Sequence, residues 1–207
     1  MKPDPISDIE RRDRLRLIRT ATVGPITWRK LMDHFGSTRD ALDGLPELAG
    51  RAAGEILNVP DTATADAELA QLEACAARLL TLGEPDYPTS LAQIDDAPPT
   101  LAVRGDIAIF SEPGIGVVGA RNASVNGQRL AETMARDLAT ADIAIISGLA
   151  RGIDTAAHQG ALATHGQTVA VMASGVDIVY LPENQALYDR IADQGAVISE
   201  TPPGLRP

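Results

Sequence analysis

The second half of the chain alternates short, fully apolar runs with stretches of helical periodicity. The apolar runs cover residues 115–119, 143–147, 168–173 and 196–199, and the helical stretches between them cover 126–140, 154–164 and 183–194. Strands that are apolar on both faces and separated by helices are typical of a parallel sheet covered by helices. The pattern therefore predicts an α/β fold with a Rossmann-like, doubly wound parallel sheet, in which ligands bind beyond the carboxyl ends of the strands.

The first part of the chain has helical periodicity. Apolar residues recur at helical spacing before and after a break at residues 23–25, and Gly36 ends the second of these segments. Further helices are expected over 37–42, 45–57 and 63–82. The Gly-Pro break resembles that of a small all-helical domain of the sterile-alpha-motif or helix-hairpin-helix kind, whose hairpin amides can hold a DNA phosphate. For the turn itself we favour the simpler interpretation, an αα-hairpin that only needs a tight turn.

Prolines separate this helical part from the α/β part. Pro85, Pro88, Pro98 and Pro99 interrupt any long element between residues 83 and 106, where only a short strand at 100–103 is expected. We therefore predict three parts. They are a helical domain over 1–82, an extended connector over 83–106 and a Rossmann-like domain over 107–207.

Composition narrows the class of protein and its compartment. Hydrophobic residues make up 44% and charged residues 22%, as in ordinary globular proteins. Aromatic residues make up only 3%, which argues against a sheet that stacks RNA bases. The lone Cys75 excludes an internal disulfide, and the sequence has neither a membrane-length apolar run nor an N-terminal signal. These features predict a soluble, cytoplasmic protein with no membrane partner.

Charge is distributed unevenly along the chain. The net charge is −10, and residues 1–82 hold 11 basic against 13 acidic side chains, whereas residues 83–207 hold 7 against 15. Residues 83–207 are too acidic to present a broad region of positive potential. A phosphate ligand there would need a few focused cations together with backbone amides.

The loops that leave the first three apolar runs carry small residues and two arginines. The candidate anion-binding residues are Gly119, Arg121, Asn122 and Ser124 in the first loop, Ser147, Gly148 and Arg151 in the second, and Gly175 in the third. Glycines let the backbone approach a ligand, free amides at a helix start attract an anion, and a guanidinium donates two hydrogen bonds to one phosphate. Because the loops leave one edge of a parallel sheet, they predict a shared anion-binding site.

Asp154 and His158 are four residues apart, on one face of the helix that follows the second loop. An acid–base pair is one interpretation. No nucleophile or second carboxylate accompanies them, so we favour structural capping residues. His165, near the end of that helix, is interpreted as incidental.

The sequence contains no motif for a cofactor, a metal ion or a catalytic set of residues. Gly114, Gly116 and Gly119 make a literal G-x-G-x-x-G, but Gly116 lies inside the apolar run, whereas a dinucleotide fingerprint begins after its strand. Metal-ligand spacing, a Walker lysine and a nucleophile elbow are all missing from the sequence. The prediction is a protein that is not an enzyme and that uses no metal and no cofactor.

Three stretches of the chain closely resemble the DNA-processing protein A (DprA, also called Smf) family. They read GVVGAR at 116–121, ISGLARGIDTAAH at 146–158 and GVDIVYLPEN at 175–184. The connector and the 23–25 hairpin are also similar. The resemblance implies a sterile-alpha-motif-like domain before an extended Rossmann domain, with Gly119, Arg121, Ser147 and Gly148 gripping phosphate and Arg151 and Asp154 in the second motif.

The resemblance also implies a function and partners. Family members bind and protect single-stranded DNA and load a RecA-type recombinase on it during natural transformation, and a homodimer is expected. They also continue beyond the position of Pro207, so the resemblance implies a Rossmann domain truncated at its C-terminus. Such a domain would be completed by oligomerisation or by further chain, or it would function poorly alone.

Two other functions are kept as alternatives. A nucleotide-processing enzyme similar to the phosphoribohydrolases would need a Pro-Gly-Gly-x-Gly-Thr loop with a following Glu, and the sequence has no such loop. The helical domain by itself would fit a protein-interaction module.

Overall fold

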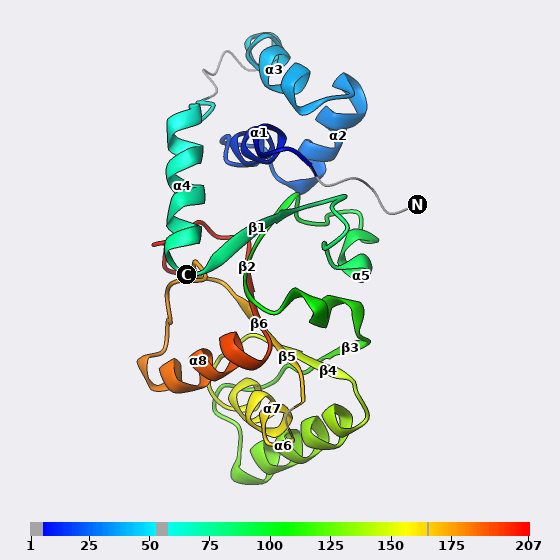
Figure 1. Ribbon diagram of the computed structural model, residues 1–207, viewed down its shortest axis with the longest axis vertical. Coiled ribbons are helices and arrows are strands. Elements are labelled where there is room, and N and C mark those ends of the chain that lie inside the picture. Colours follow the sequence, from blue (N-terminus) through cyan, green and yellow to red (C-terminus); the bar gives the residue numbers. More distant parts are fainter. Residues whose placement is uncertain (1–5, 53–57, 165) are drawn as a thin grey trace. The chain divides into compact units, whose positions relative to one another are not determined.

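The computed structural model describes residues 6–52, 58–164 and 166–207 (Figure 1). The chain divides into two compact units, one made of residues 1–71 and 79–101 and the other of residues 72–78 and 102–207. The first unit is mainly helical and the second is α/β, so the predicted fold class of a helical domain before an α/β domain is confirmed. The boundaries at residues 82 and 106, predicted on either side of an extended connector, stay a prediction.

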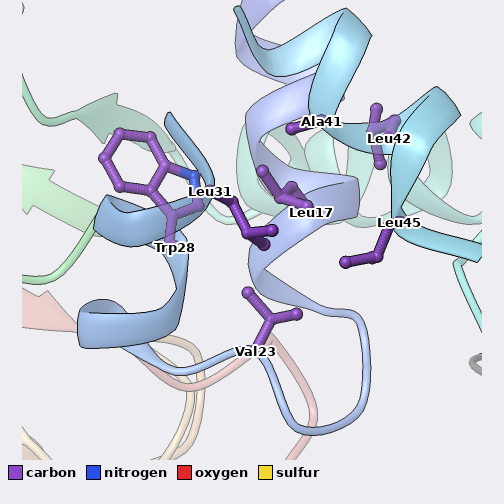
Figure 2. Packing of buried hydrophobic residues seen from close by; sticks show 7 residues of the cluster. All are labelled: Leu17, Val23, Trp28, Leu31, Ala41, Leu42 and Leu45. Carbon is purple, nitrogen blue, oxygen red and sulfur yellow. The ribbon is translucent and has the colours of Figure 1, made fainter. Parts of the chain in front are cut away.

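Three helices of the first unit enclose its core. They are α1 (Asp8–Ile18), α2 (Pro25–Phe35) and α3 (Thr38–Ala52). Seven buried residues converge from these helices and the α1–α2 turn, namely Leu17, Val23, Trp28, Leu31, Ala41, Leu42 and Leu45 (Figure 2). Full burial of a valine or leucine side chain contributes about 1.5–3 kcal/mol to the stability of the fold. Gly36, with a φ of 76°, ends α2 in the left-handed conformation that glycine adopts readily.

Helix α3 replaces two of the predicted helices. The sequence indicated a break between 37–42 and 45–57, yet one helix runs through Pro46 to Ala52. A proline inside a helix costs about 3 kcal/mol. Burial of Leu42 and Leu45 in the core outweighs that cost, since each is worth about 1.5–3 kcal/mol. Residues 53–57 of the predicted helix, and His165, lie outside the described residues.

The helix predicted over 63–82 is wrong in its second half. Helix α4 (Thr62–Ala74) ends early, and strand β1 (Ala77–Thr81) follows it. Ala76 has a φ of 55°, which no helix continues through. Leu79 and Leu80 are both buried, so the two opposite faces of the strand are covered. The leucine spacing fitted a helix, but pairing with strand β2 decided the structure.

The predicted connector contains more regular structure than expected. It holds the short helix α5 (Thr89–Ala92) and strand β2 (Thr100–Gly105), which extends two residues beyond the predicted strand. A 3₁₀ helix, η1 (Ile107–Ser111), follows.

The α/β unit is built on parallel strands. Its remaining elements are β3 (Gly114–Gly116), α6 (Val125–Thr140), β4 (Ala144–Ser147), α7 (Ile153–Leu162), β5 (Thr168–Met172), η2 (Pro182–Asn184), α8 (Gln185–Gln194) and β6 (Ala196–Ser199). The strand order is β1-β2-β6-β5-β4-β3. Strands β3 to β6 pair in parallel, whereas β2 pairs antiparallel with β6. Among the described residues the sheet is therefore mixed and has six strands.

The four parallel strands follow one another in one direction across the sheet. Right-handed crossovers between strands ordered in this way place every connecting helix on the same face. Ile145 of β4, fully buried, packs against alanines of both α6 and α7, which confirms this for two helices. A reversal of strand order, which makes a sheet doubly wound, is not found among the described strands. The carboxyl ends of β3, β4 and β5 consequently meet at one edge.

Candidate phosphate-binding site

A pocket of about 300 Å³ opens where the loops after β4 and β5 meet the loop after β3. Three of the predicted residues line it, namely Arg121, Gly148 and Arg151. The rest of the wall is partly apolar, with Leu149, Met172, Val179 and Leu181. The two arginines predicted to share an edge of the sheet therefore share one pocket.

The first loop presents Arg121. Its side chain is exposed and makes no hydrogen bond or ion pair within the described parts of the chain. The loop lies close to the start of α7, because the Ile153 amide donates to the Ala120 carbonyl at 3.3 Å. A Cβ on Gly119 would lie 2.6–2.9 Å from side-chain carbons of Ile153, and one on Gly152 would lie 2.3 Å from the Ala120 oxygen. Glycine at both positions permits this close approach.

Hydrogen bonds to Asp154 and Asn184 fix the conformation of the second loop. The Asp154 carboxylate accepts hydrogen bonds from the amides of Gly148 and Ala150, at 3.2 and 3.4 Å. Leu149 has a φ of 56°, an uncommon conformation for a residue with a Cβ. The Asn184 amide nitrogen donates to the Leu149 carbonyl at 2.9 Å and so secures this backbone. The loop is therefore fixed on both sides, at Asp154 and at Asn184.

Arg151 differs from Arg121 in having a partner. Its Nε and Nη2 atoms both lie 2.6 Å from Oε1 of Glu183 in η2. The hydrogen bond of Glu183 with its own backbone and the one from Arg151 lower the pKa of that carboxyl. Glu183 therefore carries its negative charge at neutral pH.

Four other predicted residues are engaged elsewhere or lie outside the pocket wall. The Ser147 hydroxyl is buried and donates to the Val117 carbonyl at 2.6 Å. Ser124 caps α6 by accepting from the Gly127 amide, and the Gly175 amide donates to the Leu205 carbonyl. Asn122 is exposed on the first loop. Their direct contact with a phosphate stays a prediction.

His158 lies inside the unit, away from solvent. It is fully buried, and its Nδ1 atom is 2.7 Å from the Thr168 hydroxyl, which itself donates to the Ile145 carbonyl. Burial lowers the pKa of His158 to about 4. A neutral, buried imidazole holds α7 against β5 and has no access to a ligand in the pocket.

Several contributors to the pocket were missed by the sequence analysis. Tyr180, 57% exposed, and Asn184 line the wall, and Glu183 pairs with Arg151. All three lie in the 175–184 stretch that carried the family resemblance, which was the available signal. The pairing of Arg151 with a residue 32 positions away has no local sequence signature.

The described residues offer neither a metal cluster nor a membrane-spanning helix. In the described ranges, no cluster of three or more His, Cys, Asp or Glu side chains is arranged to hold a metal ion. None of the helices described has the length and apolarity to span a membrane.

Two family models match the chain. One, described as DNA recombination-mediator protein A, matches residues 78–207, and the other, a DprA-like N-terminal HHH domain, matches residues 8–71. The chain is 32% identical to Protein Smf of Synechocystis, over 89% of this chain and 49% of that protein. It is 40% identical to DNA processing protein DprA of Streptococcus pneumoniae, over 58% of this chain and 43% of that protein. The chain thus spans about half the length of the curated relatives it matches.

Solved structures show the same likeness. DNA processing protein A from Streptococcus pneumoniae matches with a TM-score of 0.66 and 29% identity, over 89% of this chain and 70% of that one. DNA processing protein A from Helicobacter pylori, a structure concerned with its single-stranded DNA binding mode, matches with a TM-score of 0.57 and 26% identity, over 63% of this chain and 58% of that one.

Proposed function

The chain belongs to the DNA recombination-mediator protein A family, and from this premise we propose that it binds single-stranded DNA through the pocket lined by Arg121 and Arg151. The observation that carries the proposal is the convergence of these two guanidinium groups on one pocket at the carboxyl edge of the parallel strands. The name of the Helicobacter pylori structure, which concerns single-stranded DNA binding, supports it.

Electrostatics favours a focused contact. Residues 83–207 carry 7 basic against 15 acidic side chains, so this part of the chain repels a polyanion at long range. Within the pocket, however, Arg121 has no internal partner in the described chain and can donate two parallel hydrogen bonds to a phosphate. Binding should therefore depend on one or two strong contacts and weaken as salt rises.

The apolar wall favours a nucleotide over a bare anion. Leu149, Met172 and Val179 offer nothing to a phosphate, whereas they can cover the face of a base. A base is free to enter a pocket when it is not paired, which favours single strands over duplex. The pocket volume of about 300 Å³ lies at the lower end of the range for small-molecule sites.

We also propose the finer features that the family resemblance implies. The protein would act by binding and not by catalysis, since a carboxylate or imidazole for acid–base chemistry does not line the pocket among its described residues. It would work in the cytoplasm as a homodimer and load a RecA-type recombinase on the DNA that it protects.

The test is Arg121→Ala, measured by filter binding of an oligo-dT at two ionic strengths. Loss of a charge-assisted contact should weaken binding about tenfold at low salt. The slope of log affinity against log salt should fall by about 0.7, the value for one phosphate of a single strand.

Arg129→Ala is the matched control. Arg129 is an exposed arginine of the same unit, on α6, that does not line the pocket. Its removal changes the net charge equally and should change affinity by less than about twofold. Equal losses from both variants, or no loss from Arg121→Ala, would mean that the DNA binds elsewhere.

A further inference from the structure

Arg151, which lines the proposed DNA pocket, forms an ion pair with Glu183. Two of the three guanidinium nitrogens, Nε and Nη2, lie 2.6 Å from one carboxylate oxygen, and the two side chains are 62% and 47% exposed. The pair is therefore exposed to solvent, and a phosphate reaches Arg151 only in competition with Glu183.

This pair changes the charge that the pocket offers. Of the described residues lining the pocket, only Arg121 and Arg151 have charged side chains. Glu183 cancels the charge of Arg151. Asp154, behind the loop, directs its carboxylate to two backbone amides. Arg121 is thus left as the one uncompensated charged side chain at the pocket.

One uncompensated cation matches one kind of phosphate. A phosphodiester within a DNA chain carries a single negative charge, whereas a terminal phosphate monoester carries about −1.5 to −2 at pH 7. A second cation increases the binding energy of a dianion more than that of a monoanion. Arg151 is the second cation at this pocket, and Glu183 neutralises it.

Resting on the proposed function, we propose that Glu183 makes this pocket select phosphodiesters over phosphate monoesters by neutralising Arg151. The pocket then favours the interior of a DNA strand and stays free of mononucleotides. The lowered pKa of the Glu183 carboxyl keeps this selection in force at neutral pH.

A competition assay with Glu183→Gln tests the selection. A labelled oligo-dT without terminal phosphate is displaced either by thymidine monophosphate, a monoester, or by the dinucleoside monophosphate TpT, a diester. Glu183→Gln should improve displacement by the monoester about fivefold and by the diester less than about twofold. In an Arg151→Ala background, the substitution should no longer change the ratio of the two.

Glu132→Gln is the matched control. Glu132 forms an equally short pair with Arg136 on α6, at 2.6 Å, with side chains 39% and 41% exposed. Its substitution makes the same charge change and also frees an arginine, but one that does not line the pocket. It should alter neither competitor.

The outcomes separate this inference from the proposed function. Equal improvement of both competitors, no change, or weaker binding of both in Glu183→Gln overturns the selection, while sensitivity of oligo-dT binding to Arg121→Ala keeps the pocket as the DNA site. Absence of oligo-dT binding in the wild-type protein and in Glu183→Gln overturns both.

Discussion

Gly119 shows how one missing side chain shapes the proposed DNA pocket. Its backbone touches Ile153 at the start of α7, where a Cβ would come within 2.6–2.9 Å of three side-chain carbons. We expect Gly119→Ala to lower the free energy of unfolding by about 1–3 kcal/mol, as overpacking does. It should also weaken DNA binding, since it displaces the loop that carries Arg121. Denaturant titration and filter binding measure the two effects.

Two further variants identify the cause. Gly116→Ala adds the same methyl group where nothing lies within 4 Å, so it should be nearly neutral. Ile153→Ala combined with Gly119→Ala should recover part of the loss, because the clash is removed. Failure of that rescue would mean that the contact with Ile153 is not the reason for glycine.

His158 makes the stability of the α/β unit depend on pH. Its pKa is about 4 in the folded protein, lowered by burial, against an ordinary value of 6.5. As pH falls below 6.5 the unfolded chain takes up the proton first, so stability is present above that pH and is lost progressively down to pH 4. We expect this group to reduce the free energy of unfolding by about 2 kcal/mol between pH 7.5 and pH 5.

Denaturant titrations of the wild type and His158→Gln at both pH values isolate this contribution. The variant should be less stable than the wild type at pH 7.5 but lose less on acidification. Parallel losses in the two proteins would assign the pH dependence to other groups.

Among the elements, α1 carries a dense group of arginines that suggests more free positive charge than the structure shows. Five arginines fall within residues 11–19, a density that on sequence alone is compatible with a DNA contact. In the structure each has an acidic partner within its own unit. The pairs are Arg11–Glu84, Arg12–Asp66, Arg14–Glu10, Arg16–Asp13 and Arg19–Glu68. The helix therefore presents little free positive charge.

We expect Arg19→Gln to act on stability and not on binding. Arg19 and Glu68 lie 2.8 Å apart with side chains only 21% and 14% exposed, so the substitution leaves a partly buried carboxylate unpaired. The free energy of unfolding should fall by about 1 kcal/mol, while oligo-dT affinity should change less than about twofold. A loss of affinity comparable to that of Arg121→Ala would place α1 in the DNA interface.

At the scale of the whole molecule, periodicity predicted the fold class better than the individual boundaries. The alternation of apolar runs and helices identified the strands β4, β5 and β6 and placed the loops with Arg121 and Arg151 at one edge, because parallel strands share their direction. The segment 77–82 failed because Leu72, Ala76 and Leu79 fit helical spacing equally well, and only pairing with β2 distinguishes the two structures.

The sequence predicted which loops form the candidate site, but it did not predict the hydrogen bonds and ion pairs that the side chains of these loops make. Strand ends and glycine turns are local features, so they can be found in the sequence. The buried hydroxyl of Ser147, the amide of Gly175 bonded to Leu205, and the Glu183 carboxylate on Arg151 all depend on contacts between distant segments. Sequence spacing carries no signal for such contacts.

The segment after β6 crosses the loop after β5 and reaches the pocket. The Gly204 amide donates to both carboxylate oxygens of Asp177, and Pro207 lines the pocket wall. A chain segment or label that extends from Pro207 would therefore leave from the wall of the proposed DNA pocket and compete with DNA for access to it.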